Sequence, residues 1–372
     1  MFGRSRPIFC VEARMQAIVV SALTDNRPGL PERLTARAVI VGNSSVDVAD
    51  LVLLGLLRGQ WIKFQASVDR GLALESLRLA GLSGDELQTA ARRFRYEHRL
   101  ISARELTAWL DARSLSAADL SGVIKRHLLR IREADRRVDG TSLDASDVLW
   151  PEAVCGGVLR MLARAAADLM ASSYRLGGRP PIPADPARVQ STLELACEHP
   201  ATGLVELGEP ELRARLKRLL SFERALEDLR EKVADEHAIS RCVASHPLDW
   251  LQVTGRELKF EDEGAAREAR LLIVDDDHSP EEVAERTETE VHPRRLLLEA
   301  VSVDAAAALV ASVPGEVAGP WREADGWRLL LVDSKRRPSV GDPGLRELAK
   351  QELLRGALDQ TLAGRASWPQ AL

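Results

Sequence analysis

Apolar residues recur at helical spacing over most of the chain, and this pattern predicts a largely helical protein. A short strand is expected at Thr35–Val41, where the sequence alternates. A turn follows, and an apolar helix then begins at Val46 and breaks near Gly59, because glycine weakens a helix interior. Three further helices each begin with a Ser followed three residues later by an acidic residue, the capping-box pattern, at Ser83–Glu86, Ser102–Glu105 and Ser116–Asp119.

The helix that begins at Ser116 carries one apolar stripe, whose members recur every three or four residues: Leu120, Val123, Ile124, His127, Leu128 and Ile131. Because His127 lies on this stripe, we interpret it as a histidine at the edge of the core and not as a catalyst. Another helix is expected over about 150–174. The segment Leu176–Pro186 contains four prolines and two glycines, which is typical of a linker. Two helices are expected after it, at about 186–198 and 210–246.

The hydrophobic period changes after residue 250, which predicts a small α+β unit. Strands are expected at Leu251–Phe260 and Trp327–Val332, with a third, short strand ended by Gly319-Pro320. Pro314-Gly315 suits a type II turn and Asp325-Gly326 a tight hairpin. The helices expected in this part of the chain are 261–274, a short one capped by Ser279–Glu282, 304–312 and the final 342–364.

Composition and charge exclude some classes of function. The 372 residues are 45% hydrophobic and 29% charged, as in soluble globular proteins. The net charge of −5 argues against a nucleic-acid-binding protein, which would carry a basic face. We interpret Arg92, Arg93, Arg95 and Arg99 as a solvated helix face, with a local anionic partner as the alternative. No run approaches the ~20 apolar residues of a membrane span and no signal peptide is evident, so we expect a cytoplasmic location without membrane insertion.

The sequence offers little support for metal or cofactor chemistry. The cysteines lack a CxxC pair and are expected to be free thiols. Cys242 and His246 share a helix face with His237 nearby, but zinc sites use four ligands at tighter spacing, so no metal is expected. Nucleotide-binding and hydrolase motifs are absent, and no cofactor is expected. The four cysteines are Cys10, Cys155, Cys197 and Cys242.

Three stretches carry a family resemblance: a strand, an Asn-containing turn and a helix at 37–55; a series of helices at 83–130; and a turn-rich segment at 313–338. The third is the most specific, with Pro-Gly-Glu-Val, then Gly-Pro, then Gly-Trp before the last strand. Together they resemble the SurA/PpiC-type chaperones, which carry a parvulin peptidyl-prolyl isomerase domain.

The resemblance implies an α+β fold that is mainly α. A helical chaperone-like module and a small parvulin-like α/β domain are expected, with the C-terminal helix packing back on the helical module. The bounds we expect are an N-terminal extension at 1–34, the helical module at 35–175, a linker with helices of unclear role at 176–246, the parvulin-like domain at 247–338 and the C-terminal helix at 339–372.

The resemblance also implies where a catalytic site would lie. Parvulin-type isomerases have a histidine on the first strand and another on the last, and here those positions hold Glu257 and Arg328. These two residues are expected to face each other, either as an ion pair or as a repurposed polar site. The proline pocket is expected near Val301, Ala305 and Trp327. The domain does contain two histidines, His278 and His292, but they lie outside the expected strands and are expected in loops.

Three functions remain open. The first is a chaperone-like protein that binds an unfolded or precursor peptide, or an enzyme that modifies such a peptide during maturation of a ribosomal product. Trp61, Phe64, Trp109 and Trp150 are candidates to line its groove, with core packing as the alternative because Trp is usually buried. The second is an active prolyl isomerase with a different polar cluster, and the third is a structural subunit that stabilises a partner enzyme.

Overall fold

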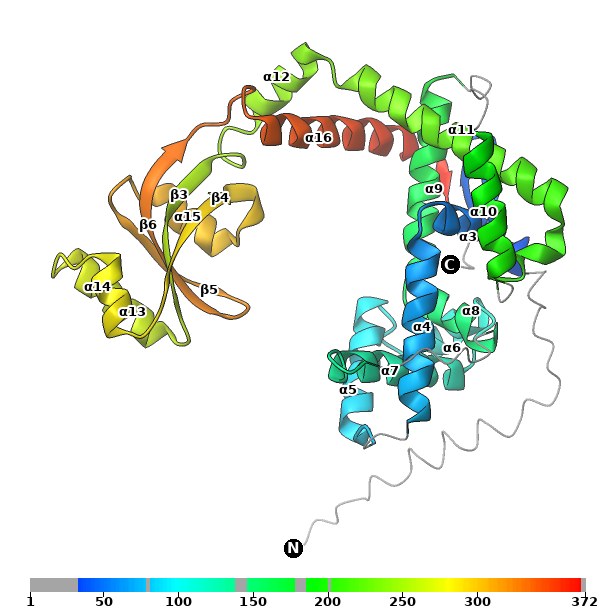
Figure 1. The fold of residues 1–372 in the computed structure, drawn as a ribbon, viewed down its shortest axis with the longest axis horizontal. Coiled ribbons are helices and arrows are strands. Elements are labelled where there is room, and N and C mark those ends of the chain that lie inside the picture. Colours follow the sequence, from blue (N-terminus) through cyan, green and yellow to red (C-terminus); the bar gives the residue numbers. More distant parts are fainter. Residues whose placement is uncertain (1–32, 78–80, 138–145, 178–184, 200–201, 369–372) are drawn as a thin grey trace, which may run out of the picture. The chain divides into compact units, whose positions relative to one another are not determined.

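The structure is a computed structural model that describes residues 33–77, 81–137, 146–177, 185–199 and 202–368. Over these residues it contains 14 α-helices and two small antiparallel sheets, so the expected fold class is confirmed (Figure 1). The chain divides into two compact units. We call Met1–Leu226 with Thr361–Leu372 the helical unit, and Glu227–Gln360 the sheet unit.

The sheet of the helical unit joins the two ends of the described chain. Its strand order is β2 (Ser44–Asp47), β1 (Arg37–Val41), β7 (Ala366–Ser367). The predicted strand is confirmed as β1. The helix predicted to begin at Val46 begins instead at Val48, because Ser44–Asp47 turns back and pairs with β1. β7 pairs with the other edge of β1, which brings residues from the end of the chain into the same sheet.

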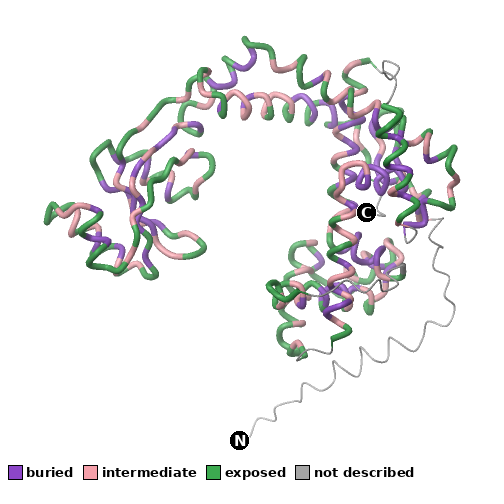
Figure 2. The backbone as a smooth tube through the Cα atoms, viewed as in Figure 1, coloured by how far each residue is buried: buried purple, intermediate pink, exposed green. Residues whose placement is uncertain are grey.

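α3 (Val48–Leu57) is the central helix of this unit. All its residues except the last are buried, as expected for a helix that is hydrophobic on every side (Figure 2). It contacts α4 (Gln60–Ser76), α9 (Val158–Arg175) and α10 (Pro186–Glu198). The predicted break near Gly59 is confirmed, since this glycine adopts a φ of 67° between α3 and α4.

The helices that follow begin where their capping boxes predict. Each box forms both of its hydrogen bonds, at α5 (Gly84–Glu97), α6 (Ala103–Asp111) and α7 (Ala117–Arg132). The exposed His127 lies outside the core, which corrects its interpretation as a core-edge histidine.

Two of the predicted long helices are each interrupted. The helix expected at 150–174 is split into α8 (Ser146–Cys155) and α9, because Gly157 adopts a left-handed φ of 75° between them. The one expected at 210–246 is split into α11 (Glu209–Val233) and α12 (Glu236–Ser245), where the Asp235 side chain caps α12. A short 3-10 turn, η2 (Leu204–Leu207), precedes α11, and most of the predicted linker lies outside the described residues.

The sheet unit is built on a four-stranded antiparallel sheet. Two of its strands were predicted in place, and β5 continues through Gly319-Pro320, where the sequence indicated its end. β4 was not predicted; it contains Pro293, which an edge strand tolerates. The strand order is β4 (Val291–Leu297), β3 (Gln252–Phe260), β6 (Gly326–Arg336), β5 (Val317–Glu323).

Helices cover both faces of this sheet (Figure 1). On one face, α13 (Glu263–Val274) and α14 (Pro280–Arg286) pack on a core that includes Leu258 and Leu329. On the other face, α15 (Val303–Ala311) packs on a second core that includes Leu330 and Trp321. Successive strand residues point to opposite faces, so neighbours in sequence serve different cores. The 3-10 turn η3 (Leu298–Ala300) leads into α15.

Turn residues position the ends of these strands. Gly315 adopts a φ of 94°, as the predicted Pro-Gly turn requires. The hairpin between β5 and β6 turns at Ala324 and Asp325, since Glu323 pairs with Gly326. The predicted final helix is α16 (Pro343–Leu362), whose first turn is capped by the Asp342 carboxylate, which accepts a hydrogen bond from the Gly344 amide at 2.8 Å.

One position in β3 has no room for a side chain. A Cβ atom on Gly255 would lie 2.3 Å from the Leu331 carbonyl oxygen. We expect Gly255→Ala to lower the free energy of unfolding of the sheet unit by about 1–3 kcal/mol, because the strands must move apart. Hydrogen exchange of the β3 and β6 amides measures this loss. Gly356→Ala in α16, with open space around its Cβ, is the matched control and should leave the same amides unchanged; equal protection in both variants would contradict the prediction.

Candidate functional site

A buried ion cluster lies on the α15 side of the sheet. Glu257 on β3 and Arg328 on β6 are diagonal neighbours, since Glu257 is opposite Leu330 and Arg328 opposite Lys259. The Glu257 Oε2 and Arg328 Nε atoms are 3.8 Å apart, and the two residues are 6% and 5% exposed. The two residues therefore form an ion pair, which is one of the two alternatives that the resemblance implied.

The two residues have further charged partners. Arg294 on β4 lies 3.2 Å from the Glu257 carboxylate, and Arg328 donates a hydrogen bond to Asp325 at 2.5 Å. Hydrogen bonds from Lys259 and then Arg328 lower the pKa of Asp325 to about 2. An arginine at this position is a fixed cation that donates hydrogen bonds and cannot accept a proton, so the cluster differs in chemistry from a pair of histidines.

Arg328 keeps spare hydrogen-bonding capacity. Its buried Nε and Nη1 atoms make no hydrogen bond within the described chain, although Nε lies 3.4 Å from the Glu323 carboxylate. Buried donors usually have partners. The cluster can therefore hold a polar group, but its charges are largely committed to one another.

The expected proline pocket is not assembled as predicted. Val301 and Ala305 belong to the core beneath α15, whereas Trp327 packs with the core beneath α13 and α14 on the opposite face. The alternation along β6 is the reason, because Trp327 and Arg328 are neighbours and point to opposite sides. These three residues cannot line one pocket.

The two histidines of this unit differ in position. His278 lies in a loop as expected, where its Nε2 atom is 2.9 Å from the Arg286 guanidinium. The loop prediction is wrong for His292, which lies on β4 opposite Glu257. Its side chain is exposed beside Glu290 and is not part of the buried cluster.

The aromatic candidates of the helical unit fall into two groups. Trp61 and Trp150 are buried, so they pack in the core, as the alternative interpretation held. The Trp150 indole N–H donates a hydrogen bond to the Arg113 carbonyl at 3.0 Å. Phe64 is half-buried and packs edge-on against Trp61, with ring centroids 5.1 Å apart. Trp109 is half-buried and contacts Phe94 on α5 at 5.5 Å, which places it beside the groove described next.

A groove runs between α5, α7 and α8, and we call it the α5–α7 groove. Its volume is about 490 Å³, within the range of ligand sites. No residue of α5 is fully buried, although amphipathic helices normally bury their apolar stripe. Ile131 on α7 remains 61% exposed. The apolar side chains that line the groove are Phe94, Val123, Ile124, Leu128 and Ile131.

Charged residues also line this groove, among them Glu152 and Arg130. Glu152 on α8 is buried and lies 2.6 Å from the Arg126 Nε atom and 3.1 Å from the Arg130 guanidinium. Burial, and then the neighbouring Glu152 carboxylate, raise the pKa of the Cys155 thiol to about 12, so this thiol stays protonated at neutral pH. The apolar stripe did not indicate that Arg126 would be buried, because its burial depends on a partner 26 residues away.

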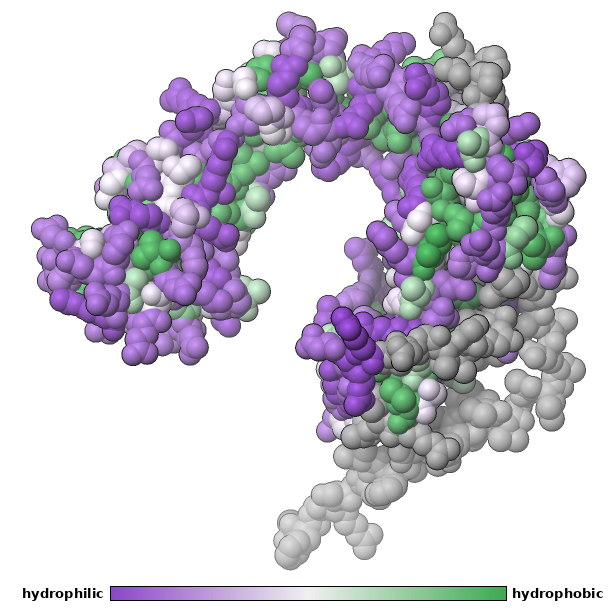
Figure 3. Space-filling model, in the orientation of Figure 1, coloured by the Kyte–Doolittle hydropathy of each residue, from purple (hydrophilic) through white to green (hydrophobic). Residues whose placement is uncertain are grey.

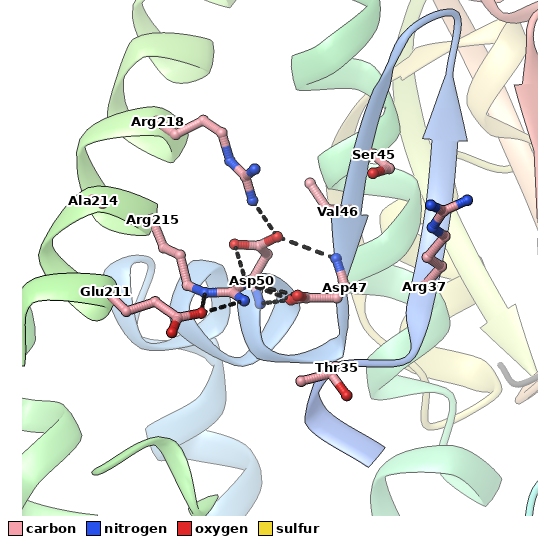
Figure 4. Close-up of a pocket in the computed structure, with 10 residues that line it drawn as sticks. All are labelled: Thr35, Arg37, Ser45, Val46, Asp47, Asp50, Glu211, Ala214, Arg215 and Arg218. Atoms are coloured by element: carbon pink, nitrogen blue, oxygen red, sulfur yellow. Dashed lines mark hydrogen bonds and ion pairs between the residues drawn. The ribbon is translucent and has the colours of Figure 1, made fainter. Parts of the chain in front are cut away.

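A second, strongly charged cavity of about 450 Å³ lies between the β1–β2 hairpin and α11. Figure 4 shows Arg215 and Arg218 of α11 directed at Asp50, which is buried at the start of α3. Arg218 donates to the Asp50 carboxylate at 2.5 Å, and Arg215 donates to Asp47 at 2.7 Å. Burial, and then the Asp47 carboxylate, raise the pKa of Asp50 above its usual value. No sequence pattern predicted this network, because its partners are 168 residues apart.

The described residues contain no group of three or more His, Cys, Asp or Glu side chains placed to hold a metal ion. Among the helices of the described segments, none is long and apolar enough to cross a membrane.

Solved structures provide the comparisons with known proteins. The chain is structurally similar to a PrsA peptidylprolyl isomerase from Bacillus anthracis, with a TM-score of 0.30 and 14% identity over 55% of this chain and 96% of that one. It is similar to PrsA from Bacillus subtilis, with a TM-score of 0.21 and 10% identity over 58% and 87%. A structure of the SurA-like chaperones PEB4 and Cj1289 of Campylobacter jejuni gives a TM-score of 0.19 and 8% identity over 57% and 88%. The sequence matches no family model, and the curated proteins give no match.

The contribution of the buried Glu257–Arg328 pair to the stability of the sheet unit can be tested by substitution. We expect Arg328→Met to lower the free energy of unfolding of the sheet unit by about 3 kcal/mol, because Glu257 loses a buried partner. Glu257→Leu combined with Arg328→Met should cost less than the single change, since no buried charge is left behind. Hydrogen exchange of the β3 and β6 amides measures both; a double variant less stable than Arg328→Met would contradict the prediction.

Proposed function

We propose that this protein is a chaperone-like protein that binds extended peptide segments in the α5–α7 groove and has little or no prolyl isomerase activity. Its clients would be unfolded chains or a ribosomally made precursor peptide, or the enzyme that modifies such a peptide. The proposal agrees with the family that the sequence resembles.

The observation that carries the proposal is the apolar lining of a groove that nothing in the described unit fills. Ile131 and Phe94 offer apolar surface from opposite sides, and a leucine or phenylalanine side chain of a client would bury that surface. Burying such a side chain contributes about 1.5–3 kcal/mol. Arg130 and Glu97 border the same groove, where they pair with Glu152 and Arg93.

The chemistry of the sheet unit supports the second half of the proposal. Twisting a prolyl peptide bond requires a barrier of about 20 kcal/mol to be lowered, which needs an apolar proline pocket beside a polar cluster. Here Val301 and Trp327 serve cores on opposite faces of the sheet, and Arg328 is held by carboxylates. An active isomerase remains the second candidate, because the unbonded Nη1 atom of Arg328 could act on a client carbonyl after a rearrangement.

Two-dimensional NMR exchange on proline-containing peptides, with and without catalytic amounts of the full chain, tests both halves at once. We expect peptide signals to broaden or shift without faster cis/trans exchange. Accelerated exchange would overturn the claim of lost catalysis. Neither broadening nor exchange, over a panel of apolar peptides, would overturn the peptide-binding proposal and favour a structural subunit.

Ile131→Ser tests the location of binding. The side chain is exposed, so we expect little change in stability but about tenfold weaker peptide binding, because about 1.4 kcal/mol of apolar contact is lost. Fluorescence anisotropy of a labelled apolar peptide measures the change. Met161→Ser on α9 is the matched control, since this methionine is 47% exposed and does not line the groove. Equal effects of the two variants would place the peptide elsewhere.

A further inference from the structure

The surface of α5 that faces away from the α5–α7 groove carries a third cavity, of about 210 Å³. Two large side chains stand in solvent here: Tyr96 is 78% exposed and Ile101 is 79% exposed. Single exposed apolar residues are ordinary, whereas contiguous apolar surface can mark an interaction site, and here both side chains line the same cavity. We call this the α5 edge; its cavity is lined by Arg92, Arg95, Tyr96, Leu100 and Ile101.

The α5 edge is held in shape by the arginine at its centre. The Arg95 guanidinium donates hydrogen bonds to the carbonyl oxygens of Leu100, at 3.0 Å, and of Ile101. The chain can turn back so tightly because Arg99 adopts a φ of 56°, and the Leu100 amide donates to the Arg95 carbonyl at 2.8 Å. Leu100 is thereby buried while Ile101 is displayed beside Tyr96. These contacts make the exposed pair a fixed feature.

The charge of this surface is opposite to that of the whole chain. Arg92 and Arg95 line its cavity, Arg99 lies beside them, and no acidic side chain is among the lining residues, whereas the protein carries a net charge of −5. Arg93 and Glu97 pair with each other at 2.8 Å on the groove side of the helix. Arg92 and Arg99 are exposed and form no ion pair with another described residue. Figure 3 shows strongly hydrophilic side chains beside a small hydrophobic group over the region where Figure 1 labels α5 and α7.

From this combination we infer that the α5 edge selects clients with an acidic segment that also carries large apolar side chains. This inference rests on the proposed function, because it places the α5–α7 groove and the α5 edge on the two sides of one helix, where one extended client would contact both. The client's carboxylates pair with Arg92 and Arg99, and its apolar side chain packs on Tyr96 and Ile101. The phosphates of a nucleic acid would pair with the arginines, but a nucleic acid has no apolar side chain that would pack on the exposed isoleucine.

The test uses the full chain and three labelled 12-residue peptides that share the same leucines and phenylalanines. The intervening positions are Asp/Glu in the first, Asn/Gln in the second and Lys in the third. Anisotropy titrations at low salt should give the acidic peptide at least about fivefold tighter binding than the amide peptide, and the lysine peptide the weakest. High salt should remove the difference, because exposed charges are screened.

Variants then locate the effect. Arg92→Glu with Arg99→Asn should lower the ratio of the affinities for the acidic and the amide peptide to about one or below; asparagine tolerates the left-handed φ at position 99. Arg322→Glu with Arg337→Asn makes the same change in charge at exposed arginines of the sheet unit and should keep the preference.

The outcomes separate this inference from the proposed function. Equal binding of all three peptides, or a preference that survives Arg92→Glu with Arg99→Asn, would overturn the inference and leave peptide binding standing. Absence of binding to every peptide would overturn both. Single-stranded DNA that binds more tightly than the acidic peptide, and loses its binding in the same variant, would show a general polyanion site and overturn the inference.

Discussion

The helical unit depends on the neutralisation of one buried carboxylate. α3 is buried on every side, yet its first turn contains Asp50, which is 1% exposed. A buried charge without partners is strongly unfavourable. Here Asp50 accepts a hydrogen bond from the Asp47 amide at the helix N-terminus, where negative charge is favourable, and pairs with Arg215 and Arg218 of α11. The same carboxylate therefore fixes the β1–β2 hairpin, the central helix and α11 in one arrangement.

Buried charged residues have different roles in the two units. In the sheet unit, Glu257 and Arg328 sit inside the fold and hold adjacent strands together. In the helical unit, Glu152 pairs with Arg126 and Arg130 beside a groove in which Ile131 remains exposed. The exposed apolar surface of the α5–α7 groove therefore supports peptide binding better than the sheet unit does. The polar cluster of the sheet unit is best explained as an ion pair that stabilises the pairing of two strands.

α5 is the element that connects these features to function. Its capping box fixes where the helix begins, but the helix packs only partly against α7, which leaves one apolar side to the α5–α7 groove and a basic side to the α5 edge. Arg95 is committed to backbone carbonyls, while Arg92 and Arg99 are not engaged within the described chain. One short helix thus presents two chemically different surfaces.

Local sequence signals determined much of this protein. The capping boxes at Ser83, Ser102 and Ser116, the break at Gly59 and the Pro-Gly turn before β5 act over three or four residues, so they were predicted in place. The facing of Glu257 and Arg328 was also predicted, but only through a family resemblance. Only the tertiary structure decided the features that depend on distant partners. Pro293 lies on an edge strand, and Trp327 packs on the opposite face of the sheet from Ala305. Arg126 is buried against Glu152, while its neighbour His127 is exposed. Burial and pairing are properties of surfaces brought together from far apart in the chain, and periodicity along the sequence carries no record of them.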